Sequence, residues 1–151
     1  MDVEIGGSFP STLDEKGRIS IPIKLRDRYS GELVITMGLR NCGWIMTAEV
    51  WEHLYTRLMK SGELTEGYRQ EMELRFVAPK TLVEVDKTGR IALPKVVRSQ
   101  AGLIKDCLVL NLQNRLEVWD EEAYSAYLNQ HQPKVLEAVE NMGPMSLFEL
   151  N

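Results

Sequence analysis

An internal repeat constrains this chain more than any other feature of its sequence. Residues 13–27 (LDEKGRISIPIKLRD) align with residues 85–99 (VDKTGRIALPKVVRS) at a constant shift of 72 positions. A shared core would explain the apolar matches, but not arginines that recur beside a turn. The repeat therefore predicts two copies of one small module. The identical pairs are Asp14/Asp86, Gly17/Gly89, Arg18/Arg90, Ile19/Ile91, Pro22/Pro94 and Arg26/Arg98.

Each copy has the sequence pattern of a small β-rich unit. Alternating apolar and polar residues predict a half-buried strand before the turn and a second short strand after it. A proline suited to a first helical position follows, and then a glycine that can end a helix. The later parts of the copies align with a slip of about one residue. The expected strands are 9–13, 33–37 and 44–47, then 81–85, 108–112 and 116–119, and the expected short helices are 22–29 and 94–100.

The segment between the copies and the end of the chain are predicted to be helical. Residues 49–76 carry apolar side chains at helical spacing, which are more typical of a core or an interface than of a ligand site, with a break at Ser61-Gly62. A further helix is expected over Pro133–Asn141, and the apolar tail behind it can pack on the domain or on a neighbouring subunit. The expected boundaries are a first module at 5–52, a helical connector at 53–80, a second module at 81–124, and a C-terminal helix and tail at 125–151.

Charge is distributed unevenly along the chain. A net charge of −4 and an isoelectric point near 5.3 are unusual for a nucleic-acid-binding protein. However, residues 13–28 carry a net charge of +2 and residues 80–98 a net charge of +3, whereas residues 117–151 carry −6. One basic cluster is usually a solvated face, but two clusters at matching positions of a repeat favour a common polyanionic partner.

The repeated turn has residues suited to holding an arginine outward. Asp14 and Asp86 can accept hydrogen bonds from backbone amides, and a glycine, Gly17 or Gly89, can adopt the positive φ that closes a tight turn. An arginine on a stiff turn loses little entropy on binding, and its guanidinium can contact a guanine edge or a phosphate. Pairing of aspartate with arginine inside the turn is the competing interpretation, and it would give the arginine a structural role. The candidate DNA contacts are Arg18 and Arg90, with Lys16, Lys87, Lys24, Arg26, Lys95 and Arg98 as contacts to the DNA backbone.

Several functional classes lack their characteristic residues. Cys42 and Cys107 lie neither in a CxxC motif nor at metal-ligand spacing from a histidine, so no zinc site or disulfide is expected. His53 and His131 have no repeat partners and belong to no recognisable catalytic group, and no nucleotide-binding glycine motif is present. We therefore expect no enzymatic activity, cofactor, metal or small-molecule substrate. An acidic N-terminus and the lack of a hydrophobic run of roughly 20 residues predict a cytoplasmic protein without a membrane span.

The motifs DEKGRISIP and DKTGRIALP, repeated within one chain of 151 residues, closely resemble the MraZ family. The resemblance covers essentially the whole chain, and its most specific element is the paired D-x-x-x-R motif at residues 14–18 and 86–90. It implies an α+β fold in which two tandem β-rich modules of the AbrB-like swapped-hairpin type form a pseudo-two-fold barrel, with a helical connector and a C-terminal helix.

The resemblance also implies a function. Such a protein would form a ring-like homo-oligomer with the turns on one rim, and it would bind repeats in double-stranded promoter DNA of the division and cell wall gene cluster. It would act chiefly as a repressor in the cytoplasm, associated with the nucleoid. The alternatives are an antitoxin or transition-state regulator of the wider AbrB or MazE type, and a structural module that binds a protein. Because Glu15-Lys16-Gly17 is replaced by Lys87-Thr88-Gly89 in the second copy, we expect unequal DNA contacts from the two halves.

Overall fold

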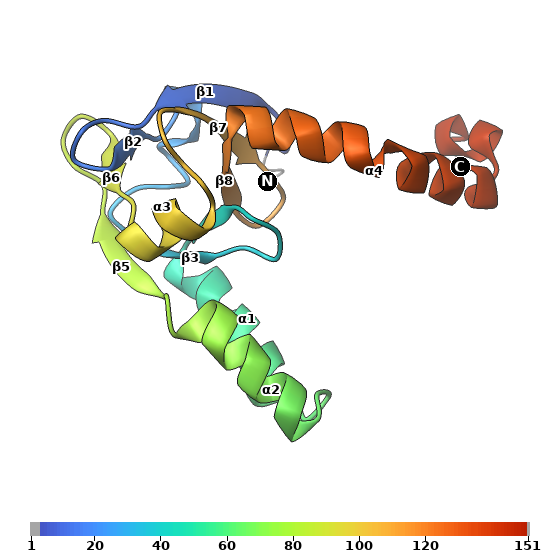
Figure 1. Cartoon of the computed structure of the whole chain (residues 1–151), viewed down its shortest axis with the longest axis horizontal. Coiled ribbons are helices and arrows are strands. Elements are labelled where there is room, and N and C mark those ends of the chain that lie inside the picture. Colours follow the sequence, from blue (N-terminus) through green and yellow to red (C-terminus); the bar gives the residue numbers. More distant parts are fainter. Residues whose placement is uncertain (1–3, 151) are drawn as a thin grey trace. The chain divides into compact units, whose positions relative to one another are not determined.

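The computed structural model describes residues 4–150, and the chain divides into two compact units. The first unit extends to Asp120 and contains both copies of the repeat and the connector, whereas the second begins at Glu121. The first unit comprises β1 (Ser8–Thr12), β2 (Arg18–Ser20), η1 (Ile23–Leu25), β3 (Glu32–Met37), β4 (Gly43–Met46), α1 (Ala48–Met59), α2 (Glu66–Met72), η2 (Glu73–Val77), β5 (Thr81–Glu84), β6 (Arg90–Ala92), α3 (Lys95–Gln100), β7 (Asp106–Asn111) and β8 (Leu116–Asp120); the second comprises α4 (Glu121–Met142) and η3 (Pro144–Phe148) (Figure 1).

The two copies of the repeat exchange strands. The main sheet has the order β1-β7-β8-β4-β3-β5, and β2 and β6 form a separate antiparallel pair (Figure 1). The first strand of each copy pairs with the third strand of the other copy, β1 with β7 and β5 with β3. Replacing each strand by its counterpart in the other copy gives the same order reversed, so a pseudo-two-fold axis runs between β4 and β8. The predicted α+β fold with two tandem, strand-swapped modules is confirmed.

The main sheet is open, so the expected barrel does not close. Its order ends at β1 and β5, and within residues 4–150 neither strand pairs with a further strand on its outer side. β2 and β6 could have bridged these ends, but each is only three residues long. Their backbone hydrogen bonds join the two strands to each other. The pseudo-two-fold arrangement that the resemblance implied is therefore present, but its main sheet does not close into a barrel.

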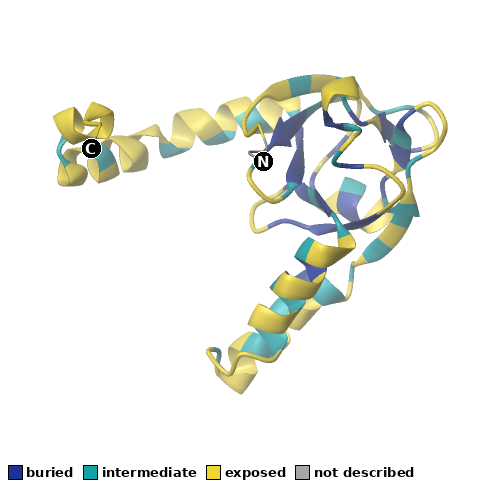
Figure 2. Ribbon diagram, turned by 180° about the vertical axis from the view of Figure 1, so that it is seen from behind, coloured by how far each residue is buried: buried dark blue, intermediate teal, exposed yellow. Residues whose placement is uncertain are grey.

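The main core draws on both copies. Ile19 of β2 lies opposite Ile91 of β6, and the two side chains are 0% and 1% exposed. Ile21 and Leu93 follow them into the same cluster, which continues along the buried face of the main sheet (Figure 2). Burial of one such side chain contributes about 1.5–3 kcal/mol. Each copy thus obtains much of its stability from apolar residues of the other.

The connector is helical, with the predicted break at Ser61-Gly62. Thr47 caps α1 by accepting a hydrogen bond from the amide of Val50, as expected for a threonine before a first helical turn. Trp51 of α1 is buried in a second, smaller cluster against β3 and β4. Trp51 and the apolar residues packed on it therefore belong to a core, one of the two roles that the sequence favoured, whereas Tyr68 and Leu74 remain exposed.

A buried carboxylate joins the two central strands. Glu117 of β8 lies opposite Trp44 of β4 and is only 9% exposed. The indole nitrogens of Trp44 and Trp119 each donate to this carboxylate at 2.9 Å, and Arg115 Nη2 donates at 2.8 Å. Two tryptophans from the sheet and an arginine from the turn before β8 thus satisfy a charge at the contact between the copies.

The helix expected over 22–29 is much shorter. It is a single 3₁₀ turn, Ile23–Leu25, and Pro22 is its N-cap rather than its first residue. Arg26 donates to the carbonyl of Ile23, and beyond it Asp27 and Ser30 favour turns over helix. The matching segment of the second copy forms α3 over Lys95–Gln100, close to the expected 94–100.

The register slip between the copies is two residues at β3 and β7, and at β4 and β8 it is the expected one residue. Phe9 pairs with Val109, and Thr81, which corresponds to Phe9 at the 72-residue shift, pairs with Ile35. Ile35 and Val109 are therefore equivalent, and their numbers differ by 74. The second copy takes up the extra chain between Gly102 and β7.

The second unit contains one continuous helix where the sequence predicted a separate helix over 133–141. The helix α4 extends over Glu121–Met142, with Pro133 inside it. Proline removes one backbone hydrogen bond, to the carbonyl of Asn129, and this helix of 22 residues has long stretches on both sides to tolerate the loss. None of the helices within residues 4–150 combines the length and hydropathy that a membrane span requires.

Candidate nucleic-acid interface

The turn of the first copy is organised by one carboxylate. Asp14 Oδ1 accepts hydrogen bonds from the backbone amides of Lys16 and Arg18, both at 2.9 Å. The amide of Gly17 donates to the carbonyl of Asp14 at 3.0 Å, and Gly17 has a φ of 76°. The aspartate therefore fixes the backbone on both sides of the glycine, and the arginine begins β2 directly after it.

The turn of the second copy has the same backbone. Asp86 Oδ1 accepts from the amides of Thr88 and Arg90 at 2.9 Å, and Gly89 donates to the carbonyl of Asp86 at 3.0 Å. Gly89 has a φ of 82°. Equal bond patterns in two segments 72 residues apart indicate that the Asp and Gly of each motif specify this turn.

The pairing of β2 with β6 brings the two turns together. Ile21 donates to the carbonyl of Gly89, and Leu93 donates to the carbonyl of Gly17, both at 2.8 Å. Each turn is thus bonded to the strand that follows the other turn. The two copies present their D-x-x-x-R motifs as one continuous surface.

The aspartates and arginines of the two turns form one charge cluster. Arg18 Nε donates to Asp14 Oδ2 at 2.9 Å, and Arg18 Nη1 lies 3.9 Å from Asp86 Oδ2. Arg90 Nη1 lies 3.6 Å from Asp14 Oδ2, and Arg90 Nε donates to Thr88 Oγ1 at 3.0 Å. The side chains of Arg18 and Arg90 remain 30% and 37% exposed. Both arginines are oriented by partners, and both remain accessible from solvent.

The carboxylates of this cluster are held in the ionised form. The hydrogen bond from the Arg18 amide lowers the pKa of Asp14, against a smaller opposing effect of burial. The backbone bond from Arg90 and the hydroxyl of Thr88 lower the pKa of Asp86 to about 2. Two aspartates therefore balance two arginines at neutral pH. Of the exposed charges nearby, Lys16 is offset by Glu15, so the net positive charge of the two turns comes from Lys87.

Arg26 and Arg98 pack on the turns of the opposite copy. Arg26 Nε donates to the carbonyl of Ile21 at 2.9 Å, and Arg98 Nε donates to that of Leu93 at 3.0 Å. A Cβ built on Gly17 would lie 2.8 Å from Arg98 Cζ, and one on Gly89 would collide with the Arg26 guanidinium. The sequence assigned these arginines to the DNA backbone and missed this packing. The signal was present, because glycine and arginine recur nine positions apart in both copies.

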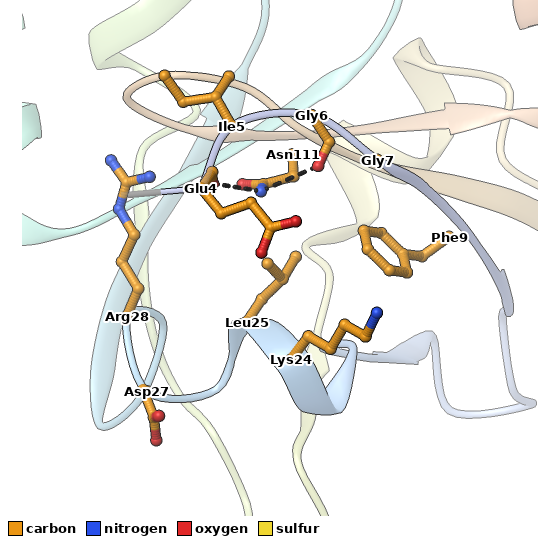
Figure 3. A pocket seen from close by; sticks show the side chains of 10 residues that line it. All are labelled: Glu4, Ile5, Gly6, Gly7, Phe9, Lys24, Leu25, Asp27, Arg28 and Asn111. Atoms are coloured by element: carbon orange, nitrogen blue, oxygen red, sulfur yellow. Dashed lines mark hydrogen bonds between the residues drawn. The ribbon is translucent and has the colours of Figure 1, made fainter. Parts of the chain in front are cut away.

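Lys24 and Lys95 are exposed but do not occupy equivalent positions. Lys24 lines a pocket of about 440 Å³ with Arg28 on its opposite side (Figure 3). In a second pocket of about 410 Å³, Val96 takes the place of Lys24 and Met37 takes the place of Asn111. The pseudo-symmetry of the backbone does not extend to these side chains, and the proposed contact of Lys24 with DNA has no counterpart in the other copy.

Comparison with known proteins identifies the family. A family model described as "MraZ protein, putative antitoxin-like" matches residues 5–72 and 76–142, which include both copies. The chain belongs to the MraZ family. A protein of Treponema denticola named "Transcriptional regulator MraZ" is 42% identical over 138 residues, which cover 91% of this chain and 96% of that protein.

Other MraZ relatives carry the same name. A protein of Ligilactobacillus salivarius is 35% identical over 90% of this chain and 94% of its own length. A protein of Treponema pallidum is 32% identical over 93% of this chain and 95% of its own length. The predicted family membership is confirmed, and the MraZ relatives are named as transcriptional regulators rather than as enzymes.

The cysteines and histidines of this MraZ chain lie in surroundings typical of structural residues. Burial raises the pKa of Cys42 to about 12 and that of Cys107 to about 11, so both thiols stay protonated at neutral pH. His131 stacks on Tyr127 within α4, and His53 is exposed on α1. Within residues 4–150, no group of three or more histidine, cysteine or acidic side chains is placed to hold a metal ion.

Proposed function

We propose that this chain is a sequence-specific, DNA-binding transcriptional regulator that acts as a homo-oligomer. The observation that carries this proposal is the pair of adjacent turns, in which two arginines are oriented by partners and still exposed. The names of the MraZ relatives support the regulatory role. In its finer form, the protein represses promoters of the division and cell wall gene cluster from a ring-like assembly in the cytoplasm, associated with the nucleoid.

The turns suit double-stranded DNA for a physical reason. A guanidinium already fixed by hydrogen bonds loses little entropy on binding, and it can form two parallel bonds to a guanine edge in the major groove. Lys16 and Lys87 extend from the same turns as point charges that suit phosphates. One pair of turns has few contacts, so useful affinity requires several protomers that bind repeated sites together.

The acidic total charge does not oppose this proposal. The net negative charge of the chain comes from residues outside the repeated segments, with −6 over residues 117–151. The segments that contain the turns are basic, and at 0.15 M salt a charge acts over about 8 Å. The charges closest to DNA at the turns would therefore be those of the basic repeated segments.

The test is an electrophoretic mobility shift with DNA from upstream of the protein's own gene. Arg18→Ala and Arg90→Ala together should abolish the specific complex, whereas Arg57→Ala on α1 should not change it, because Arg57 pairs with Glu63 in the connector. Lys16→Ala and Lys87→Ala should weaken binding to every duplex and make the salt dependence shallower by about 0.9 in log–log slope per lost phosphate contact. Light scattering of the free protein measures its oligomeric state.

A protein-binding module is the second candidate. The end of the chain carries exposed apolar side chains, including Met145 at 82% and Phe148 at 84%. If these residues define the function, the protein should not bind the promoter duplex, and the double arginine variant should behave as the wild type. A specific promoter complex that the double variant loses would exclude this candidate as the main function.

A further inference from the structure

The two turns share a backbone but differ in one hydrogen-bond partner. The residue before the glycine is Lys16 in the first copy and Thr88 in the second. Thr88 Oγ1 donates to Asp86 Oδ1 at 2.8 Å and accepts from Arg90 Nε at 3.0 Å. Lys16 has no acceptor to offer, and in its copy the arginine bonds directly to the aspartate. A hydroxyl is thus inserted between aspartate and arginine in the second turn only.

This insertion changes how strongly each arginine is held. Arg18 Nε makes a bond of 2.9 Å to Asp14 in which the donor and the acceptor are both charged, whereas in the bond from Arg90 Nε to Thr88 only the donor is charged. Arg90 Nε is held by a neutral hydroxyl, and its ion-pair contact is the longer one of 3.6 Å to Asp14 of the other copy. Binding of a base edge by Arg18 competes with an adjacent carboxylate, whereas binding by Arg90 competes with weaker interactions.

The local charge differs in the same direction. The second turn has Lys87 where the first has Glu15, so residues 86–90 carry a net +1 and residues 14–18 carry no net charge. The side chain of Arg90 is also more exposed, 37% against 30% for Arg18. Orientation, charge and access all favour the second turn as the site of contact with an electron-rich base edge.

We propose that the two turns have different roles, with Arg90 as the arginine that reads a base and Thr88 as the residue that positions it. Arg18, paired with Asp14, supports the shared cluster and contributes charge. This inference rests on the proposed function, and it assigns sequence discrimination to one half of the pseudo-dimer. Thr88 touches no DNA in this scheme, because it acts through Arg90.

The test compares two conservative variants, Arg90→Lys and Arg18→Lys. Lysine keeps the charge but cannot form the paired bonds of a guanidinium, so a base-reading arginine loses discrimination and an ion-pairing arginine largely does not. The measurement is the ratio of dissociation constants for the upstream promoter fragment and a scrambled duplex of equal length. Arg90→Lys should lower this ratio at least about fivefold, the lower limit for one bidentate base contact. Arg18→Lys should change the ratio less than twofold.

Thr88 is tested with three variants of one position. Thr88→Val removes the hydroxyl and should lower the discrimination ratio. Thr88→Ser keeps the hydroxyl and should leave the ratio unchanged. Thr88→Lys copies the first turn and should lower the ratio as Thr88→Val does. Affinity for the scrambled duplex should not fall in any of them, which separates positioning from a general loss of structure. Thermal melting checks that each variant folds.

The outcomes separate this inference from the proposed function. Equal loss of discrimination in Arg90→Lys and Arg18→Lys would overturn the proposed difference between the two arginines. This comparison remains valid even if a Thr88 variant fails to fold. An unchanged ratio in a folded Thr88→Val would overturn the positioning role. If the wild type binds the promoter and scrambled duplexes equally or not at all, the proposed function itself fails, and this inference fails with it.

Discussion

Gly89 is a position where both the backbone and the surroundings exclude a side chain. Its φ of 82° lies in the left-handed region, and a Cβ would collide with the Arg26 guanidinium. We expect Gly89→Ala to lower the free energy of unfolding by about 1–3 kcal/mol, the usual cost of a residue held in an unfavourable backbone conformation. Chemical denaturation measures the change.

Two other glycines separate the causes of this loss. Gly62 has a φ of 75° with nothing within 4 Å of a built Cβ, so Gly62→Ala reports the backbone cost alone. Gly67 lies within α2 in open space, and Gly67→Ala should raise stability by about 0.5–1 kcal/mol. A loss at Gly89 no larger than that at Gly62 would show that Arg26 moves aside without cost.

At the scale of single residues, the sequence predicted the turn but did not predict the arginine that packs on it. Asp and Gly at fixed spacing have local preferences, so their roles follow from a single segment. The packing of Arg26 on Gly89 depends on how two distant segments cross, and the local preferences of residues do not determine that crossing. The exposure of Arg90 and the bond to Thr88 likewise depend on side-chain geometry that only the structure supplies.

Glu117 gives the contact between β4 and β8 a dependence on pH. Burial raises the pKa of this carboxyl, but hydrogen bonds from Trp119, Trp44 and Arg115 together outweigh burial and lower the pKa below its ordinary value. A group whose pKa is lower in the folded protein stabilises the fold above its unfolded pKa, and this contribution is lost as the pH falls through the folded pKa. We therefore expect the stability that Glu117 supplies to decline as the pH falls below the ordinary glutamate pKa of about 4.3, and to be lost as the pH passes through the lower folded pKa.

The measurement is the free energy of unfolding of the wild type and of Glu117→Gln as a function of pH. At pH 7 the variant should be less stable by about 2 kcal/mol, because charged hydrogen bonds are lost and an amide donor faces Arg115. The difference should shrink as the medium is acidified. The control is Glu52→Gln on the exposed face of α1. A difference that stays constant from pH 7 to pH 3 would contradict this account.

Pro133 limits the stability of α4. Pro133→Ala restores the amide that can donate to the carbonyl of Asn129, and alanine has the highest helix propensity. We expect slower amide hydrogen exchange on both sides of position 133, by up to about 3 kcal/mol in local opening free energy. The neighbouring change Gln132→Ala should have little effect. Unchanged exchange in Pro133→Ala would mean that the proline costs this helix nothing.

At the scale of elements, strands were easier to predict than helix ends. The sequence located every strand of the main sheet within about two residues, by alternation for β1 and β5 and by strand-like runs for the others. The helix after Pro22 is short because its later residues form turns, and α4 continues through a proline that the sequence treated as its start. Both errors concern the extent of helices, which depends on the balance of several weak preferences.

At the scale of the whole molecule, neither half of the repeat has a complete sheet of its own. Within residues 4–150, β1 pairs with β7 alone and β5 pairs with β3 alone, so each half lacks the partner of its first strand. We expect residues 1–61 and residues 62–151 to be unfolded when each is produced alone and to form a folded complex when produced together. Gly62 lies in the break of the connector, away from both clusters of buried residues.

Circular dichroism and co-purification of the two fragments test this expectation. The mixed fragments should recover the tryptophan signal of the intact chain, because Trp44 and Trp119 meet at Glu117 across the boundary between the halves. A cut at Gln113-Asn114, in the turn between β7 and β8, serves as the comparison because it divides a hairpin within one half. Independent folding of residues 1–61 would contradict the exchange of strands as a condition of stability.

Because the two strand-exchanging halves are fused into one polypeptide, corresponding positions of the halves can carry different residues. A symmetric dimer of separate subunits must carry the same residue at both of its turns, so a mutation alters both at once and its preferred target reads alike in either direction. Here a lysine at one turn can coexist with a threonine at the other. If the turns bind DNA as proposed, one protomer has a direction along the duplex, and neighbouring protomers can follow direct repeats rather than inverted ones.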